Sequence, residues 1–379
     1  MVPSFYPARA YGGPCVTVYA IAKMLSEMDN DVRVLTTDAD GRRRLTVPVN
    51  VPVQIDRHLS VTYCSRSWGE TVSLGLMKQL RQNIRWTDTV ILSGIFSSTT
   101  IPTLILCRRL RKSLLWLPHG ALMKTCLSQK PRRKAVWNKA CRLVCRGVTG
   151  FRFVTNSAIE ARDCAEAFPE LKVTVVPHTV EVPECIYPME LGGRLRLLYV
   201  GRLHPIKGIE NLIRAVSLVQ RSKTTLRWEL KIAGSGETSY DRSLKELAAS
   251  LGLSRNVMFT GPVFGDVKEM LFRESHVVVV PSYSENFCAV VGEGLARARP
   301  VITTIGVPWD GIWAHNCGLR VAGTPEALSE AIIQISGMDL HSMGLAGRKW
   351  IAEEFSEGRI SRLWCDVLDT CVAATVGKG

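Results

Sequence analysis

The stretch Leu195–Gly208 reads LRLLYVGRLHPIKG, and a helical pattern begins directly after it at Ile209. Its apolar first part, Leu195–Val200, predicts a buried strand, and Gly201 predicts the turn that ends this strand. A strand, a glycine turn and a helix in succession form the basic unit of open α/β sheets. The stretch therefore predicts the α/β fold class.

The same alternation of short apolar runs and amphipathic stretches recurs along the whole chain. The strands predicted are Val32–Thr36, Thr89–Leu92, Leu114–Leu117, Gly150–Thr155, Leu195–Val200, Glu229–Ala233, Val257–Thr260, Val277–Val280 and Pro300–Thr303. Continuous apolar strands with helices between them indicate parallel sheets that are covered on both faces. Two such series predict two α/β domains, which we place at residues 1–180 and 181–355.

Two segments depart from this alternation. Pro177–Gly193 contains three prolines and a glycine pair but little periodicity, so it predicts the linker between the domains. At the start, Met1 to Ser4 resembles the end of a strand, although an α/β domain is expected to open with a complete one. The first strand is therefore expected to be clipped, or to begin upstream of Met1.

The positive charge of the chain is concentrated in its first half. The 379 residues carry a net charge of +14, and residues 1–180 hold 26 Lys and Arg against 12 Asp and Glu. The remainder holds 22 of each kind, and no acid occurs between Asp88 and Glu160. This asymmetry predicts an anionic partner for the first half, which is nucleic acid, anionic lipid or a phosphorylated substrate. A merely solubilising surface is the alternative.

Cysteine usage and hydropathy indicate a cytoplasmic protein. The twelve cysteines lie mostly in apolar stretches, with no CxxC pair and no zinc-like spacing, so we expect reduced core thiols and no metal site. The apolar runs are far shorter than the ~20 residues that span a bilayer. We therefore expect a protein that is soluble or peripheral on the inner face of the cytoplasmic membrane.

The first candidate for chemistry is the pair Arg202 and Lys207, five residues apart after the strand Leu195–Val200. Ligands of open α/β sheets bind at the carboxyl ends of strands, and helix N-termini favour anions. A guanidinium fork and an ammonium at this place suit a diphosphate. A basic surface loop is the alternative reading.

The second candidate is the pair Glu285 and Glu293, which follows the strand Val277–Val280. The first carboxylate could accept hydrogen bonds from sugar hydroxyls, and the second could accept both hydroxyls of a ribose. The alternatives are a capping carboxylate for Glu285 and a solvated helix residue for Glu293.

Three shorter signals accompany these pairs. Gly234-Ser235-Gly236 follows a strand, and Gly12-Gly13 precedes a helix, so backbone amides at either place could approach a phosphate or a sugar. Turns explain Gly234 and Gly236 equally well. His119 closes the strand Leu114–Leu117, where it could face a cleft or be structural.

Together these elements resemble glycosyltransferase family 4 (GT4), the retaining glycosyltransferases with the GT-B fold. The resemblance runs over about residues 3–370 and rests on the glycine pairs, on Arg202 and Lys207, and on the spacing of Glu285 and Glu293. It implies two Rossmann-like domains with parallel sheets facing a central cleft. It also implies that the final helix, within 356–379, crosses back to the first domain.

The resemblance implies a role for each candidate residue. Arg202 and Lys207 would hold the donor diphosphate, Glu285 the transferred sugar and Glu293 the ribose. His119 would lie by the anomeric carbon or by the C6 hydroxyl of the sugar. The catalytic set would be His119, Glu285, Arg202 and Lys207. The donor-binding set would be Gly12, Gly13, Gly201, Arg202, Lys207, Gly234, Gly236, Val263, Glu285, Asn286, Phe287, Cys288 and Glu293. The reaction implied is sugar transfer from a nucleotide sugar with retention of configuration.

Two departures from the family pattern stand out. Cys288 and Ala298 occupy positions where the family usually has glycine. No charged participant is lost, so we expect activity. We also expect no divalent metal to be required, because Arg202 and Lys207 can stabilise the charge on the leaving phosphate. Asp38-Ala39-Asp40-Gly41 superficially resembles a metal-binding sequence but is predicted to form a turn.

The segment Pro131–Arg146 predicts a basic amphipathic helix. Val136, Ala140, Leu143 and Val144 share one stripe, and six basic residues occupy the rest. We expect this helix to dock on anionic lipid and to bring the protein to a glycan or lipid-diphosphate-linked acceptor in cell-surface glycan biosynthesis. An ordinary helix with its stripe in the core is the alternative.

Two other functions are alternatives to this one. A nucleotide-sugar epimerase has the same architecture but needs no acceptor. A non-enzymatic binder of anionic polymers is suggested by charge alone, but the chain has no recognisable nucleic-acid module and no interleaved aromatic residues. That reading would also leave Arg202, Lys207, Glu285 and Glu293 unexplained, so no nucleic-acid partner is expected.

Overall fold

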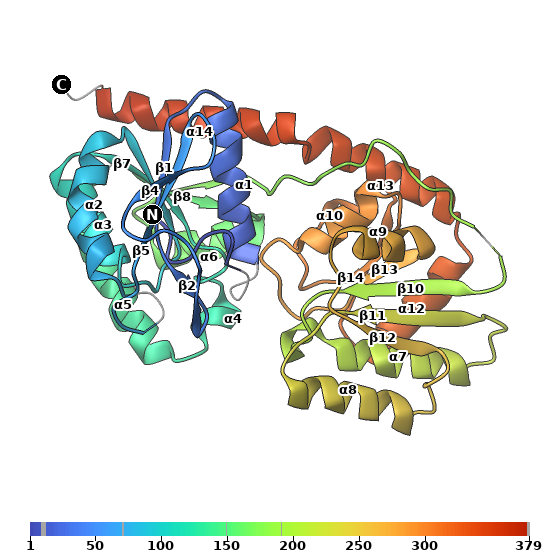
Figure 1. The fold of residues 1–379 in the computed structure, drawn as a ribbon. Coiled ribbons are helices and arrows are strands. Elements are labelled where there is room, and N and C mark those ends of the chain that lie inside the picture. Colours follow the sequence, from blue (N-terminus) through green and yellow to red (C-terminus); the bar gives the residue numbers. More distant parts are fainter. Residues whose placement is uncertain (9–12, 70–71, 149, 191, 377–379) are drawn as a thin grey trace. The chain divides into compact units, whose positions relative to one another are not determined.

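The computed structural model describes residues 1–8, 13–69, 72–148, 150–190 and 192–376. The chain forms two compact units (Figure 1). Unit 1 comprises Met1–Pro177 together with Ser361–Gly379, and unit 2 comprises His178–Ile360.

Unit 2 is built on one six-stranded sheet in which every neighbouring pair is parallel. Its strands are β10 (Leu195–Val200), β11 (Trp228–Ala233), β12 (Val257–Gly261), β13 (Val277–Val280), β14 (Val301–Thr304) and β15 (Gly318–Val321). Their spatial order is β12-β11-β10-β13-β14-β15, which is the doubly wound order 3-2-1-4-5-6. The strand order reverses between β10 and β13, and such a switch point is where open sheets bind ligands.

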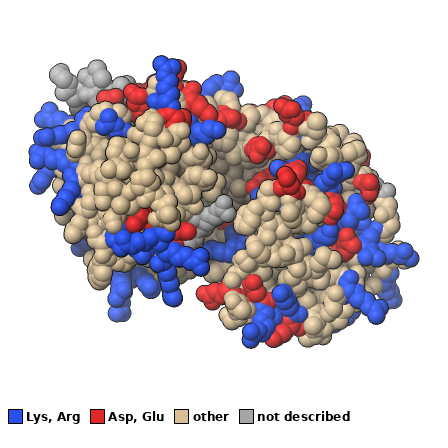
Figure 2. Space-filling view, in the orientation of Figure 1, with Lys and Arg blue, Asp and Glu red and all other residues tan. Residues whose placement is uncertain are grey.

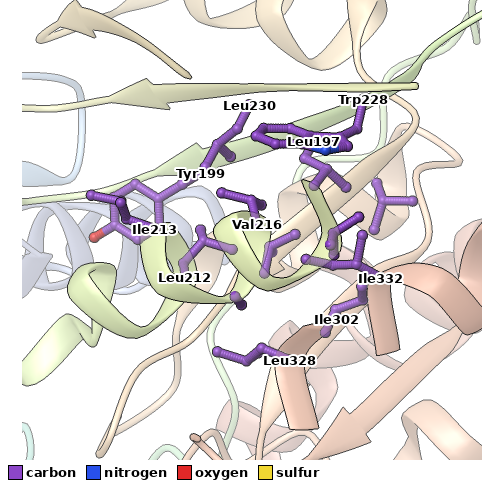
Figure 3. Packing of buried hydrophobic residues seen from close by; sticks show 14 of the residues in the cluster. Leu197, Tyr199, Leu212, Ile213, Val216, Trp228, Leu230, Ile302, Leu328 and Ile332 are labelled. Carbon is purple, nitrogen blue, oxygen red and sulfur yellow. The ribbon is translucent and has the colours of Figure 1, made fainter. Parts of the chain in front are cut away.

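Helices cover both faces of this sheet. They are η1 (Pro205–Lys207), α7 (Ile209–Arg221), α8 (Thr238–Ser250), α9 (Gly265–Glu274), α10 (Ala289–Ala296), α11 (Gly311–Ala314), α12 (Pro325–Ser336) and α13 (Leu340–Glu354). Figure 3 shows Leu212 and Val216 of α7 packed with the strand residues Leu197 and Leu230. Leu198, the next residue of β10, joins the opposite cluster with α10 and α13, because successive strand residues point to opposite faces.

Among its described residues, unit 1 contains two larger sheets besides a short two-stranded hairpin. β1 (Val32–Thr37) pairs parallel with β5 (Leu59–Cys64), and β4 (Pro52–Gln54) pairs antiparallel with β5. The second sheet is entirely parallel, with β6 (Thr89–Ser93), β7 (Ser113–Leu117), β8 (Phe151–Thr155) and β9 (Lys172–Val175). The fold of both units is therefore α/β with parallel sheets, as predicted.

The first two residues connect these two sheets. The Met1 amine donates to the carbonyl of Ile91 at 2.8 Å, and Ser93 N donates to the Met1 carbonyl at 2.9 Å. Val2 N donates to the carbonyl of Leu35 at 3.2 Å. Residues 1–2 thus bond to β6 on one side and to β1 on the other.

Seven helices of unit 1 surround these strands in the part of the chain that the structure describes. They are α1 (Gly13–Glu27), α2 (Leu74–Trp86), α3 (Thr100–Arg109), α4 (Lys124–Leu127), α5 (Pro131–Cys145), α6 (Ala158–Ala167) and most of α14 (Glu357–Val376). α14 is fixed to the second sheet by two hydrogen bonds. Ser113 Oγ donates to the Cys371 carbonyl at 3.0 Å, and Arg152 donates to Thr370 Oγ1 at 3.2 Å.

The segment Asp38–Gly41 differs from its predicted turn. Ala39–Asp40 forms strand β2, which pairs antiparallel with β3 (Arg43–Arg44) in a short hairpin. The Asp38 side chain is nearly fully buried and accepts a hydrogen bond from Arg66 N at 2.7 Å. The turn prediction was therefore wrong for Ala39 and Asp40, which belong to a strand. The Asp38 carboxylate ties this segment to the loop after β5.

The exposed face of α5 contradicts one of the two interpretations of this helix, in which its apolar stripe lies in the core. Val136 is 72% exposed and Leu143 is 66% exposed, whereas Cys141 and Cys145 are buried in the core of unit 1. The reading that Val136 and Leu143 belong to the core is therefore wrong. α5 presents apolar and basic side chains together to solvent.

The cysteines behave largely as core residues. Burial raises the pKa of Cys107, Cys141 and Cys317 to about 12, so these thiols stay protonated. Cys185 and Cys365 are exposed. Among the described helices, none is both long and apolar enough to cross a bilayer.

The predicted linker segment is bonded to unit 2 through its backbone carbonyls. Arg299 donates to the Tyr187 carbonyl at 3.1 Å, and His276 Nε2 contacts the Glu190 carbonyl at 2.9 Å. Arg348 donates to the carbonyl of Pro183. The described residues of this segment form no helix or strand, and three long-range contacts hold them in place.

Candidate active site

Lys207 and Glu285 meet at the switch point of the unit 2 sheet. Lys207 ends η1 after β10, and Glu285 lies in the loop after β13. Lys207 Nζ lies 2.6 Å from Glu285 Oε1, and the two side chains are only 21% and 11% exposed. The structure therefore brings together one predicted diphosphate ligand and one predicted sugar ligand.

A glycine allows the two loops to approach this closely. Gly208 has a φ of +63°, and a Cβ at this position would lie 2.2 Å from the Pro281 carbonyl oxygen. Tyr283 N also donates to the Ile206 carbonyl at 2.8 Å. Direct backbone contact thus fixes the distance between the loop that carries Lys207 and the loop that carries Glu285.

The Glu285 carboxylate is held by several neighbours. Ser282 Oγ donates to Glu285 Oε1 at 2.6 Å, and Glu285 N donates to the Gly306 carbonyl at 3.0 Å. Thr304 Oγ1 in turn donates to the Ser282 carbonyl. The carboxylate is therefore ordered before any ligand arrives, as a residue that positions a sugar requires.

Arg202 has an anchored backbone and an exposed side chain. The Tyr199 hydroxyl donates to the Arg202 carbonyl at 3.0 Å. Burial first, and the nearby charge of Glu285 second, raise the pKa of Tyr199, so its hydroxyl remains a donor. The Arg202 guanidinium is thus mounted on a rigid turn, Gly201-Arg202, from which it can reach a ligand.

The glycines of Gly234-Ser235-Gly236 have a structural explanation. A Cβ at Gly234 would lie 1.8 Å from the Gly201 oxygen, and one at Gly236 would lie 1.9 Å from the Leu203 oxygen. Leu203 N donates to the Ser235 carbonyl at 3.0 Å. These glycines let the loop after β11 lie against the Arg202 turn, and their contact with a donor remains a prediction.

Cys288 is the N-cap of α10 and has a left-handed conformation, with a φ of +66°. Burial and the adjacent Glu285 raise the pKa of its thiol well above the usual range. Phe287, just before it, is buried and packs on the Trp309 ring, with ring centroids 5.2 Å apart. The positive φ explains why glycine suits this position, because a Cβ there is strained.

The same reason applies to Ala298, whose φ is +54° at the C-terminal end of α10. Ala298 N donates to the Leu295 carbonyl, and Arg299 N donates to the Gly294 carbonyl, both at 2.9 Å. This is the Schellman pattern, in which glycine is preferred at the left-handed residue. Both departures from the family pattern are therefore strained residues rather than changes in chemistry.

Cys288→Gly is expected to give a more stable protein than Cys288→Ala, by about 1 kcal/mol. Both variants remove the thiol, but only alanine keeps the Cβ that opposes a positive φ. Urea unfolding of the two variants measures the difference. Equal stability, or a more stable alanine variant, would contradict the strain at this position.

Glu293 has a basic partner that the sequence did not reveal. Lys268 Nζ, from α9, lies 2.7 Å from Glu293 Oε1, and both side chains are about one third exposed. Val263, on the loop before α9, packs partly buried against the core cluster of α10, and Asn286 is half-buried beside Glu285. Lys268 is 25 residues from Glu293 and in another helix, so no sequence periodicity could have connected the two.

In unit 1, His119 and Gly120 form a turn with left-handed φ angles of +50° and +79°. His119 Nε2 lies 2.9 Å from Ser93 Oγ, and burial lowers the pKa of the imidazole to about 4. Gly120 N donates to Glu160 Oε1 at 2.5 Å, and Asn156 N donates to Glu160 Oε2 at 2.8 Å. The fully buried Glu160 thus fixes the turn that carries His119.

Sequence reasoning missed Ser93 and Glu160. A signal for the second was present, because Ser157 and Glu160 have the spacing of a capping box. Ser157 caps α6 as that pattern predicts, but the Glu160 side chain reaches Asn156 N and Gly120 N. Of the predicted glycines, Gly13 begins α1, whereas Gly12 lies outside the described residues.

His119→Gln is expected to reduce the acid sensitivity of the fold. An imidazole with a pKa near 6.5 in the unfolded chain binds a proton before the folded one does, whose pKa is about 4. The free energy of unfolding therefore falls as pH drops from about 6.5 to about 4, by roughly 3 kcal/mol in total. The glutamine variant should lose that much less.

Urea unfolding of wild type and His119→Gln at about pH 7 and about pH 4.5 measures this loss. His276→Gln is the matched control, since burial also lowers the pKa of His276, but in unit 2. An unchanged acid loss in His119→Gln would show that the imidazole protonates freely in the folded state.

No cluster of three or more His, Cys, Asp or Glu side chains suited to a metal ion occurs among the residues that the structure describes. Arg202, Lys207, Glu285 and Glu293 belong to unit 2, whereas His119 and Gly13 belong to unit 1.

Comparison with protein families gives two matches. Residues 11–183 match the model described as Glycosyltransferase Family 4, and residues 194–337 match the model described as Glycosyl transferases group 1. Curated relatives include a D-inositol 3-phosphate glycosyltransferase of Nocardia farcinica, 30% identical over 239 residues. A second, from an Arthrobacter species, is 31% identical over 158 residues.

These alignments cover part of each protein. They span 56% of this chain and 53% of the Nocardia protein, and 41% of this chain and 38% of the Arthrobacter protein. The chain thus matches about half of its curated relatives' length or less.

Solved structures match over nearly the whole chain. Sucrose-phosphate synthase from Thermosynechococcus elongatus has a TM-score of 0.72 at 18% identity and covers 96% of this chain and 94% of its own. HepE from Anabaena, in complex with UDP and glucose, has a TM-score of 0.68 at 17% identity, with 97% and 98% covered. WaaG, a glycosyltransferase involved in lipopolysaccharide biosynthesis, has a TM-score of 0.67 at 17% identity and full coverage of both chains. At these identities the likeness shows a shared fold, with two Rossmann-like domains.

Proposed function

Because the chain belongs to the group 1 glycosyltransferases of family 4, we propose that it transfers a sugar from a nucleoside diphosphate sugar to an acceptor. The donor is a UDP- or GDP-sugar, and the anomeric configuration is retained. The observation that carries the proposal is the placement of Arg202, Lys207 and Glu285 on the two loops at the switch point of the unit 2 sheet. The structure of HepE with UDP and glucose supports a nucleotide donor for this fold.

The proposed chemistry follows from where charge develops. As the bond to the anomeric carbon breaks, negative charge grows on the leaving diphosphate, and Arg202 and Lys207 stabilise it more strongly than in the ground state. Glu285 accepts hydrogen bonds from the transferred sugar, and Glu293 accepts them from the ribose. His119 is neutral near pH 7, so it acts as a hydrogen-bonding group beside the sugar without adding charge.

A thermal-shift screen with UDP, GDP, ADP and their sugars tests the donor. One nucleoside diphosphate is expected to stabilise the wild type, without added metal and in the presence of EDTA. Stabilisation only with a divalent cation would contradict the metal-free site. No stabilisation by any of these nucleotides would contradict the proposed function.

Product analysis tests the reaction itself. Incubation with the identified donor should release nucleoside diphosphate and form a glycosidic product only when an acceptor is present. NMR of that product reports its anomeric configuration. Conversion of the donor sugar without any acceptor would instead establish the epimerase reaction.

For the acceptor, we propose a lipid-linked or polysaccharide glycan that is reached at an anionic membrane surface, in cell-surface glycan biosynthesis. The support is the exposed face of α5, where Val136 and Leu143 project among arginines and lysines. Exposed apolar residues surrounded by basic ones are typical of helices that lie in the membrane interface. Cosedimentation with phosphatidylglycerol vesicles, compared with phosphatidylcholine vesicles, tests this attachment, and equal binding to both would contradict it.

A further inference from the structure

A cluster of arginines in unit 1 has no role in the donor site or in the α5 surface. It comprises Arg42, Arg43 and Arg44 of the β2–β3 hairpin and Arg66 of the loop after β5. We call this set the arginine hairpin site. Figure 2 shows Lys and Arg side chains gathered on the face of unit 1 where Figure 1 draws β2. The site lies at the carboxyl ends of β1 and β5, which is the ligand-binding edge of a parallel sheet.

Two of these arginines build the site. Arg66 donates to the carbonyls of Gly41 at 3.0 Å and Arg42 at 3.3 Å. In return, Arg44 donates to the carbonyl of Arg66 at 2.8 Å and to Ser65 Oγ at 3.1 Å. These reciprocal bonds fasten the hairpin to the loop, so the backbone of the hairpin is preorganised.

The acidic groups nearby neutralise only part of the site, because Asp38 pairs with Arg44. The side chain of Asp38 is 4% exposed, and it accepts bonds from Arg66 N at 2.7 Å and from Arg44 at 3.5 Å. Asp40 lies opposite Arg43 in the hairpin and is half-buried. Among the described residues, neither Arg42 nor Arg43 makes an ion pair or a side-chain hydrogen bond, and both are exposed. Two guanidinium groups therefore remain available on a fixed hairpin.

An aromatic side chain stands on the same loop. Trp68, two residues after Arg66, is 80% exposed, and its amide donates to the Val72 carbonyl at 3.2 Å. Guanidinium groups bind phosphate through paired hydrogen bonds, and an exposed indole offers a flat apolar face to a ring. This combination suits a phosphate ester carried on a sugar or polyol ring.

We propose that the arginine hairpin site binds a phosphate group of the acceptor, and that the part of the acceptor bound in unit 1 is a phosphorylated sugar or polyol. This proposal rests on the proposed function, because it names the chemistry of the acceptor. The relatives named D-inositol 3-phosphate glycosyltransferases support this chemistry. The phosphate belongs either to a soluble ester or to a lipid headgroup, and the experiment separates the two sources.

The test compares two double variants with equal charge changes. Arg42→Gln with Arg43→Gln alters the hairpin, and Arg132→Gln with Arg133→Gln alters α5. Each removes two adjacent exposed arginines from unit 1. Calorimetry measures the binding of inositol 3-phosphate, glucose 1-phosphate, inorganic phosphate and uncharged inositol. The nucleoside diphosphate of the donor is present at saturation, so that it occupies the other phosphate site.

The wild type is expected to bind a phosphorylated ring more tightly than inorganic phosphate or inositol. The hairpin variant should bind that ester about tenfold or more weakly, because charge-assisted hydrogen bonds are lost. The α5 variant should bind it unchanged but lose binding to phosphatidylglycerol vesicles. If the source is a lipid headgroup, phosphatidylinositol vesicles bind the wild type more tightly than phosphatidylglycerol vesicles, and the hairpin variant loses that preference.

Three results would overturn the proposal. One is that no phosphorylated probe and no phosphatidylinositol vesicle shows preferential binding to the wild type. The second is that both double variants weaken binding equally, which would indicate general charge. The third is that inositol binds as tightly as its phosphate. Failure of the proposed function would appear differently, as a lack of nucleotide binding in the donor screen. Neither double variant is expected to change nucleotide binding in that screen.

Discussion

Lys207→Met is expected to lower turnover roughly 100- to 1,000-fold, because it removes one cation from the developing charge of the leaving diphosphate. The loss should appear in kcat as well as in kcat/KM, since the interaction is stronger in the transition state than in the ground state. The variant also leaves Glu285, which is only 11% exposed, without its cationic partner. We therefore expect a stability loss of about 3 kcal/mol in addition.

A control must separate these two effects. Lys231 pairs with Glu274 at 2.6 Å and is 25% exposed, which matches Lys207 in distance and burial, whereas Glu274 is 42% exposed against 11% for Glu285. Lys231→Met should disturb an ion pair of unit 2 without changing turnover. Steady-state kinetics and urea unfolding of both variants give the comparison. Equal losses of turnover would mean that the Lys207 effect is structural.

Gly208→Ala is expected to destabilise unit 2 by about 2–5 kcal/mol, as the sum of a left-handed alanine and an overpacked contact. The added Cβ would lie 2.2 Å from the Pro281 carbonyl oxygen, and a backbone atom cannot swing aside as a side chain does. One of the two loops must shift, which separates Lys207 from Glu285. The activity of the molecules that remain folded should therefore also fall.

Gly252→Ala is the matched control for this substitution. Gly252 also has a positive φ, of +72°, but no heavy atom lies within 4 Å of its added Cβ. It should cost only the conformational strain, about 1–2 kcal/mol, and leave activity intact. Denaturant unfolding followed by kinetics tests both variants. If they proved equally stable, the approach of the two loops would not depend on Gly208.

Local sequence patterns predicted the two strands at the switch point and the candidate ligand residues that follow them. The four-valine strand Val277–Val280 is buried throughout, and the strand Leu195–Val200 is largely buried and apolar apart from Arg196, so both sequences indicate strands covered on both faces. The residues after each strand could therefore be located as ligand candidates. Neither the sheet order nor the contact between the loops follows from such patterns, because both are set by tertiary packing.

The unpredicted parts share a physical reason. Lys268 with Glu293, and Glu160 with Gly120, are contacts between separate elements, and one sequence carries no periodicity that connects them. On α5 the helical period allowed more than one buried face. In the structure, the helix face with Cys141 and Cys145 is buried and Val136 is exposed, whereas hydrophobicity alone would have predicted the opposite.

The distribution of thiols offers a spectroscopic opportunity. Of the cysteines, all of which lie in described segments, Cys185 and Cys365 are exposed, and they belong to unit 2 and unit 1 respectively. The deeply buried thiols, with their raised pKa values, should resist maleimide reagents. The unmodified chain thus has one preferred labelling position in each unit, and replacing either exposed cysteine by serine would leave a single position. A donor and acceptor dye pair on the unmodified chain could then report, molecule by molecule, how nucleotide binding changes the separation of the two units.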